Sequence, residues 1–156
     1  MTKTKELIRR TDRVSGFDLD TPGCISFSGG RTSGYMLRQI LDFYGGTLPK
    51  DVRVVFSNTG KEMNATLDFV RDCEVNWNVK FVMVNHNSAS RNGEPYDKLI
   101  TKRKFLPNPV TRYCTSELKI KVMKDFMLSI GHKYWVNYVG LRYDEPHRVA
   151  RLSRAK

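Results

Sequence analysis

Apolar residues in this chain gather in short continuous runs that are separated by longer stretches with a helical period. The runs lie at residues 23–27, about 51–56, 79–84 and 134–139. Near-continuous apolar runs of this length are typical of strands that are covered on both faces of a sheet. We therefore expect a sheet of about four or five strands.

Between the runs, apolar residues recur every third or fourth position, which predicts helices over residues 32–44, 62–74 and 115–130. Their expected inward residues are Met36, Leu37, Ile40, Leu41 and Tyr44, then Met63, Leu67 and Val70, then Leu118, Val122, Met123, Phe126, Met127 and Ile130. Gly45-Gly46 should end the first helix. Alternating strands and helices at this spacing predict a doubly wound α/β fold with a parallel sheet.

The first strand runs into Ser28-Gly29-Gly30-Arg31-Thr32-Ser33 and then directly into a helix. Two glycines allow a tight turn and the close approach of a ligand, and the first amides of a helix lack intrahelical partners. Hydroxyls and the Arg31 cation add donors for a phosphate or sulfate. This turn predicts a phosphate cradle, with an ordinary strand-to-helix turn and a hydroxyl cap as the alternative.

Three further unusual segments follow predicted strands or open predicted helices, at residues 57–62, 112–119 and 140–148. In an open parallel sheet, ligands gather beyond the carboxyl ends of the strands, so we expect these segments to meet the cradle. Each segment also has a simpler interpretation. Residues 57–62 would form a turn in which Asn58 or Thr59 caps the second helix. Cys114 would be a buried structural residue, and residues 140–148 would form a solvated charged loop.

Composition narrows the possible partners. The formal net charge of +11 favours polyanions, meaning a polyphosphorylated nucleotide or a nucleic acid, although a solubilising surface explains it about as well. The 3 cysteines and 3 histidines fall at no spacing typical of a disulfide framework or a metal site. A signal peptide and long apolar spans are absent, so we expect a cytoplasmic protein without membrane contact.

The 156 residues are enough for one domain of ordinary size. We expect an N-terminal arm over residues 1–22, a nucleotide-binding domain over 23–148 and a basic C-terminal end over 149–156. Residues 85–109 are rich in Asn, Ser, Gly, Pro and basic residues and predict a binding loop or mobile flap, with a short helix at 96–102.

In order, the four segments carry Ser28-Gly-Gly-x-x-Ser33, Asn58-Thr59-Gly60, Arg112-x-Cys114-Thr-x-x-Leu-Lys119 and Gly140-Leu-Arg142-x-Asp-Glu-x-x-Arg148. Together they resemble the phosphoadenosine phosphosulfate reductase-like family of the PP-loop ATP pyrophosphatase superfamily. A Walker A loop would need Gly-x-x-x-x-Gly-Lys-Ser/Thr, which the chain lacks. The resemblance covers residues 24–148, and it implies an adenine nucleotide α-hydrolase-like fold.

The resemblance implies that ATP or a phosphoadenosine sulfonucleotide binds here. It assigns the phosphates to Ser28, Gly29, Gly30, Arg31, Thr32 and Ser33, the adenosine to Asn58, Thr59 and Gly60, and a second phosphate or sulfate to Arg112, Lys119, Arg142 and Arg148. Catalytic roles are expected for Cys114, Arg31 and Lys119. In a reductase, a thiol attacks the sulfate sulfur and a thiol electron donor is needed, whereas an ATP pyrophosphatase directs attack to the α-phosphate.

Several family features are missing. Many superfamily members have Asp where this chain has Thr32, so the use of magnesium stays open. The Glu-Cys-Gly-x-His nucleophile segment of assimilatory reductases is absent, as are the Cys-Cys and Cys-x-x-Cys pairs that an iron–sulfur cluster needs. The sequence ends soon after the arginine segment, which indicates a truncated relative or an incomplete chain.

Two other functions remain open, as does the oligomeric state. A nucleic-acid-associated protein would use Lys102-Arg103-Lys104 and the basic stretch 148–156 to hold phosphates, and its binding would weaken steeply with salt. A degenerate PP-loop fold that is kept for interaction alone would have no nucleotide affinity.

Overall fold

The computed structural model describes residues 22–85, 95–148 and 150. Apart from residues 22 and 150, the expected N-terminal arm and basic C-terminal end therefore lie outside the described residues, as does part of the expected binding loop. The described strands are β1 (Gly23–Phe27), β2 (Val52–Ser57), β3 (Phe81–Val84) and β4 (Val136–Val139). They form one 4-stranded sheet in the order β3-β2-β1-β4, and every pairing is parallel.

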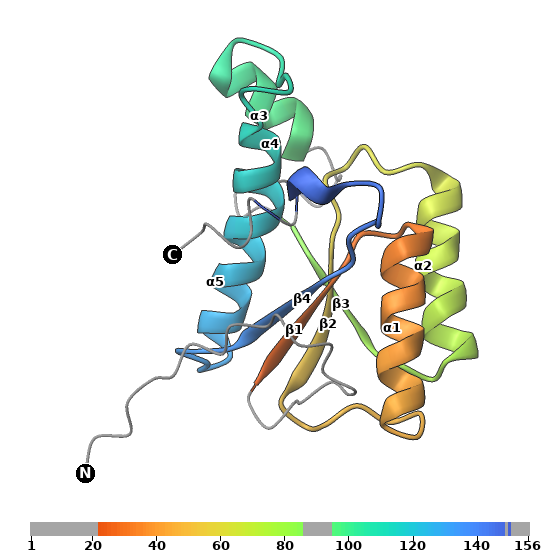
Figure 1. The fold of residues 1–156 in the computed structure, drawn as a ribbon. Coiled ribbons are helices and arrows are strands. Elements are labelled where there is room, and N and C mark those ends of the chain that lie inside the picture. The colour runs from red at the N-terminus through yellow and green to blue at the C-terminus, as the bar shows by residue number, and fades with distance from the viewer. Residues whose placement is uncertain (1–21, 86–94, 149, 151–156) are drawn as a thin grey trace.

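Helices cover both faces of this sheet (Figure 1). On one face lie α1 (Arg31–Phe43) and α2 (Asn64–Asn76). On the other lies a continuous helical rod of α4 (Tyr113–Thr115), the π-helical segment η1 (Ser116–Lys121) and α5 (Val122–Ser129). The expected short helix is α3 (Pro95–Arg103), which stands beyond the carboxyl edge of the sheet. The doubly wound α/β prediction is confirmed.

The strands divide their side chains between two cores because successive residues point to opposite faces. Ile25 and Phe27 pack with Leu37 and Ile40 of α1 and with Val70 of α2. On the opposite face, Cys24 and Val55 pack with Val122 and Met127 of the helical rod. Burial on both faces explains why the strands read as continuous apolar runs.

The predicted boundaries hold within two residues for most elements, and two predicted inward residues are wrong. Met63 is exposed because α2 begins after it, at Asn64. Ile130 is exposed because α5 ends at Ser129. As predicted, Gly45 and Gly46 follow α1, and both have positive φ, at 65° and 91°.

The chain order places a topological switch point between β1 and β4. From β1 the chain winds outward through β2 to β3, and it then crosses to the other side of β1 to add β4. The segments that leave β1 and β4 therefore diverge at the carboxyl edge, where open α/β sheets bind their ligands. No helix of the described part is both long and apolar enough to cross a bilayer.

Candidate functional site

Ser33 stabilises the turn between β1 and α1 through hydrogen bonds. The Ser33 hydroxyl is buried, donates to the Gly30 carbonyl at 2.8 Å, and accepts from the Ser28 amide at 3.2 Å. The Ser28 hydroxyl lies 3.1 Å from the same oxygen. The hydroxyls of Ser28 and Ser33 therefore stabilise the turn. They do not cap the helix, because α1 has no side-chain cap.

The two glycines of this turn meet different surroundings. Gly29 has φ +74°, and a Cβ there would lie 2.4 Å from Thr66 Cγ2, so the position requires glycine. A Cβ on Gly30 would meet only the Ser28 hydroxyl oxygen, at 3.7 Å. The backbone is therefore open to an incoming group at Gly30, next to the unpaired first amides of α1.

Arg31 begins α1 beside this opening. Its side chain is exposed, and it forms no ion pair with any residue that the structure describes. The first turn of α1 contains no acidic residue. An anion placed at this opening would meet both the positive end of the helix dipole and the guanidinium.

The second segment folds into a compact turn at the end of β2. The Gly60 amide donates to Asn58 Oδ1 at 2.9 Å, and the Thr59 hydroxyl lies 2.9 Å from Glu62 Oε1. The Tyr96 amide of α3 donates to the Thr59 carbonyl at 3.0 Å. Neither Asn58 nor Thr59 caps α2, whose N-cap is Met63, so the helix-cap reading of this segment is wrong.

The third segment forms α4 and η1, and it is tied to the second. The Ser57 hydroxyl at the end of β2 donates to the Leu118 carbonyl within η1. Lys119 Nζ lies 3.9 Å from Glu62 Oε1, the oxygen that also contacts Thr59. Glu62 thus links Thr59 and Lys119, two predicted site residues from separate segments.

The fourth segment carries its two arginines in local ion pairs. Arg142 Nε donates to Asp144 Oδ1 at 2.9 Å, and Arg148 contacts Glu145 Oε2 at 2.8 Å. The Arg142 guanidinium holds the pKa of the Asp144 carboxyl below its usual range by hydrogen bonding to it. An anion that binds Arg142 or Arg148 must therefore compete with the carboxylate that already pairs with that arginine.

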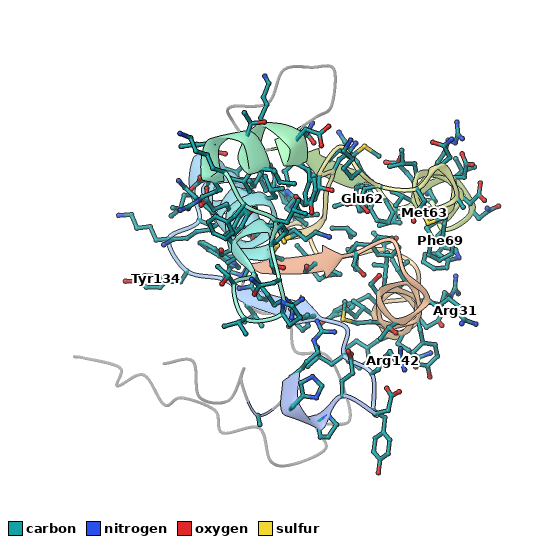
Figure 2. All side chains as sticks on the ribbon, turned by 90° about the horizontal axis from the view of Figure 1, so that it is seen from above. Arg31, Glu62, Met63, Phe69, Tyr134 and Arg142 are labelled. Carbon is teal, nitrogen blue, oxygen red and sulfur yellow. The ribbon has the colours of Figure 1, made fainter. Side chains whose placement is uncertain are left out.

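Gly140 brings the fourth segment against the first. A Cβ at Gly140 would lie 3.1 Å from the Thr32 carbonyl oxygen and 3.2 Å from Ser33 Cα, so no larger residue fits there without displacement. Figure 2, which looks down on the carboxyl edge, places Arg31 and Arg142 on the same side of the molecule. The segments after β1 and β4 therefore meet at the switch point, as expected.

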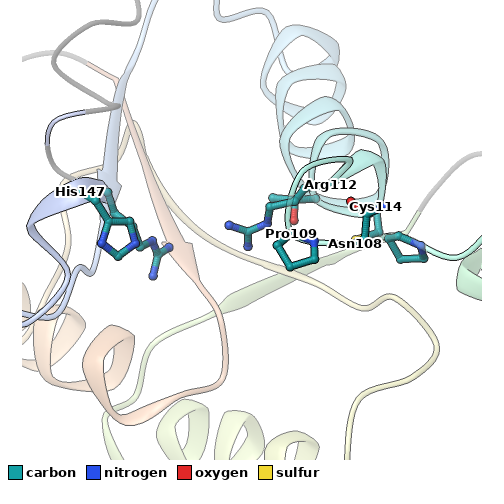
Figure 3. Close-up of a pocket in the computed structure, with 8 residues that line it drawn as sticks. Asn108, Pro109, Arg112, Cys114 and His147 are labelled. Carbon is teal, nitrogen blue, oxygen red and sulfur yellow. The ribbon is translucent and has the colours of Figure 1, made fainter.

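A pocket of about 570 Å³ lies between the third and fourth segments. Arg112, Cys114 and Thr115 line one side with Pro107, Asn108 and Pro109, and His147 and Arg148 line the other. Figure 3 shows His147 across the opening from Arg112 and Pro109. The Ser28–Ser33 turn and the Asn58–Gly60 turn are not part of this lining, so the predicted site residues divide between the cradle, the Glu62 linkage and the pocket.

Cys114 has two environments. It lines the pocket, and it also packs against the small apolar cluster of Leu99, Tyr113 and Leu118 beneath α3. Its side chain is half-buried, whereas Cys24 and Cys73 are buried in the main cores. Of the three thiols, Cys114 is the one placed beside candidate anion-binding groups.

Sequence reasoning gave no site role to Glu62, Gly140 or His147. Glu62 follows Thr59 at the spacing of a capping box, which was the available signal. His147 precedes Arg148 directly, but an isolated histidine carries no spacing signal. Among the described residues, no group of three or more His, Cys, Asp or Glu side chains is placed to hold a metal ion.

Comparison with known proteins agrees with this architecture. The family model of the phosphoadenosine phosphosulfate reductase domain matches residues 23–156. The uncharacterized nin region protein ORF290 of Escherichia phage lambda is 28% identical, over 80% of this chain and 49% of that protein. The uncharacterized protein MJ0066 of Methanocaldococcus jannaschii is 29% identical, over 85% of this chain and 25% of that protein.

This chain thus spans about half of the length of the first relative and about a quarter of the second. The family match covers the whole described domain, from the start of β1 through the arginine segment after β4. The chain therefore belongs to the phosphoadenosine phosphosulfate reductase domain family.

Proposed function

We propose that this domain binds an adenine nucleotide along the carboxyl edge of its sheet, with phosphates seated on the N-terminus of α1. The observation that carries the proposal is the open backbone at Gly30, where a Cβ would meet nothing closer than 3.7 Å. The first amides of a helix and its dipole are suited to phosphate at such an opening. Membership of a nucleotide-binding family supports the assignment.

Each predicted residue receives a role in this proposal. Arg31 and the hydroxyls of Ser28 and Thr32 contact the phosphates beside the cradle, while Ser33 and Gly29 hold its shape. The adenosine lies toward the turn of Asn58, Thr59 and Gly60. A second phosphate or a sulfate lies toward Lys119 and the pocket arginines Arg112 and Arg148, with Arg142 at the rim.

For the reaction, family membership favours reduction of a sulfonucleotide. The Cys114 thiolate would attack the sulfate sulfur, the bond from sulfur to the bridging oxygen would break, and the nucleotide phosphate would leave. Cys114 would then carry an S-sulfonate, and an external thiol would attack its Sγ to release sulfite and form a mixed disulfide. Arg112 lines the pocket with Cys114 and would neutralise the leaving phosphate.

The cradle itself favours a second reaction, attack on the α-phosphate of ATP. In that case a substrate is adenylylated, and pyrophosphate leaves onto the α1 amides and Arg31, which stabilise the departing charge. Magnesium would enter with the ATP. The three free thiols fit a reducing compartment in either case, and we assign the domain to the cytoplasm.

Calorimetric titration separates the two reactions. Wild-type protein is titrated with ATP, phosphoadenosine phosphosulfate and adenosine bisphosphate, each with and without magnesium. Preference for the bisphosphate nucleotides supports reduction, and a magnesium-dependent preference for ATP supports adenylylation. If reduction holds, Cys114→Ser keeps the nucleotide affinity and loses sulfite release in the presence of a thiol donor. Absence of binding to every nucleotide would refute both reactions.

A further inference from the structure

The segment from the middle of α3 to the start of α4 is rich in basic residues. It contains the basic residues Lys98, Lys102, Arg103, Lys104 and Arg112, and no acidic residue occurs between Asp97 and Glu117. We call residues 98–112 the basic tip, because α3 and the loop after it project beyond the carboxyl edge of the sheet (Figure 1).

Three of these cations are not paired with any carboxylate that the structure describes. Arg103 pairs with Glu117, whereas Lys102, Lys104 and Arg112 form no ion pair with the described residues. Several arginines elsewhere have local carboxylate partners, as in the pairs Arg38–Asp42, Arg71–Asp68, Arg142–Asp144 and Arg148–Glu145. The tip therefore concentrates a positive field that attracts polyanions.

Apolar side chains are exposed in the same segment. The exposed fractions are 47% for Phe105, 68% for Leu106 and 94% for Val110. Phe105 is held edge-on against Tyr113, with ring centroids 5.0 Å apart, so its ring is fixed in position while half exposed. Fixed aromatic rings among cations are the combination that binds single-stranded nucleic acid, through base stacking and phosphate contacts.

The backbone changes conformation at Lys104, directly after α3. Lys104 has φ +59° at the end of α3, in the left-handed region where glycine is the usual residue. Lys104 thus lies at the end of α3, directly before Phe105.

We propose that the basic tip binds a single strand of nucleic acid and leads it to the pocket. Pro107, Asn108, Pro109 and Arg112 belong to both the tip and the pocket lining, so a strand on the tip reaches the mouth of the pocket. The pocket part of this inference rests on the proposed nucleotide site, whereas binding at the tip stands independently of it. If the domain adenylylates a substrate, that substrate is then a polynucleotide whose reacting end or base enters the pocket.

Fluorescence anisotropy tests the tip. A labelled single strand of about 15 nucleotides and its duplex are titrated at about 50 to 200 mM salt. Lys102→Glu/Lys104→Glu is compared with Lys50→Glu/Lys80→Glu, a matched pair of exposed lysines at the opposite edge of the sheet. We expect the tip variant to lose affinity at least about tenfold and to lower the salt slope by about 1 to 2, and the control to change little. Phe105→Ala should weaken binding without changing the slope.

Three outcomes would overturn the proposal: an equal loss in the tip and control variants, duplex binding as tight as single-strand binding, or self-association in sedimentation that Leu106→Ala abolishes. Nucleotide titration of the tip variant separates this proposal from the previous one. If wild-type protein binds the strand but no mononucleotide, the nucleotide proposal fails and the tip proposal stands.

Discussion

At the scale of single residues, the two glycines of the β1–α1 turn have different structural roles. Gly29 sustains a positive φ against Thr66, and Gly30 leaves space above the helix amides. The sequence predicts that both glycines belong to one turn. Which of them supports the fold and which faces the ligand depends on contacts with α2. Thr66 lies far along the chain from this turn, so no local pattern contains that information.

Substitution of these neighbours by alanine separates their roles. Gly29→Ala should lower the free energy of unfolding by about 1 to 3 kcal/mol, because the positive φ and the Thr66 contact both oppose a Cβ. Gly30→Ala should change it by less than about 0.5 kcal/mol. Urea denaturation followed by circular dichroism measures both. Equal costs for the two variants would contradict the assignment.

Cys24 gives the fold a dependence on alkaline pH. Burial raises the pKa of its thiol from 9.0 to about 11. Below pH 9 the thiol is protonated in both states; between about 9 and 11 it ionises in the unfolded chain alone, so the native state loses roughly 2 to 3 kcal/mol of stability. Urea denaturation at pH 8 to 11 should show a steeper fall for wild type than for Cys24→Ala. Parallel curves would be inconsistent with this account.

At the scale of elements, the sequence predicts the strands and helices well because each carries a clear period. Residues 23–27 and the stripe of Leu37, Ile40 and Leu41 match the structure closely. The π-helical turn in η1 was not predicted, since a regular period of about four residues spans Leu118 and Val122. This turn contacts β2, which is distant in sequence.

That contact is the hydrogen bond from Ser57 to the Leu118 carbonyl. Removing it in Ser57→Ala leaves a buried carbonyl without its partner and should cost about 1 to 3 kcal/mol of stability. Ser129→Ala is the matched control, because its hydroxyl bonds to the Phe126 carbonyl at an exposed helix end. Denaturation midpoints compare the two. A cost for Ser57→Ala no larger than for the control would show that the contact does not fix η1.

The predicted meeting of the four segments is confirmed only in part by the packing. Gly140 against Thr32, Ser57 against Leu118 and Glu62 against Lys119 join the segments in pairs. Within the fourth segment, Arg142 pairs with Asp144 and Arg148 pairs with Glu145. Ion pairs within charged loops leave no periodic pattern in the sequence.

At the scale of the whole molecule, the strand order explains why the candidate groups gather at one edge. Strand β1 lies between β2 and β4, and the chain diverges from it toward both sides. The cradle, the Glu62 linkage and the pocket consequently share the carboxyl edge, which the basic tip overhangs. A net charge of +11 adds a general attraction for anions that any binding experiment must separate from a specific site.

The central claim is that nucleotide phosphates sit at Gly30, and calorimetry on two matched variants tests it most directly. Gly30→Asp places a carboxylate in the open space of the cradle, and Thr47→Asp places the same charge on an exposed residue at the opposite edge. We expect Gly30→Asp to weaken binding of the preferred nucleotide at least about tenfold, because like charges are brought together. Thr47→Asp should bind nearly as wild type does. Equal affinities for the two variants would contradict the claim.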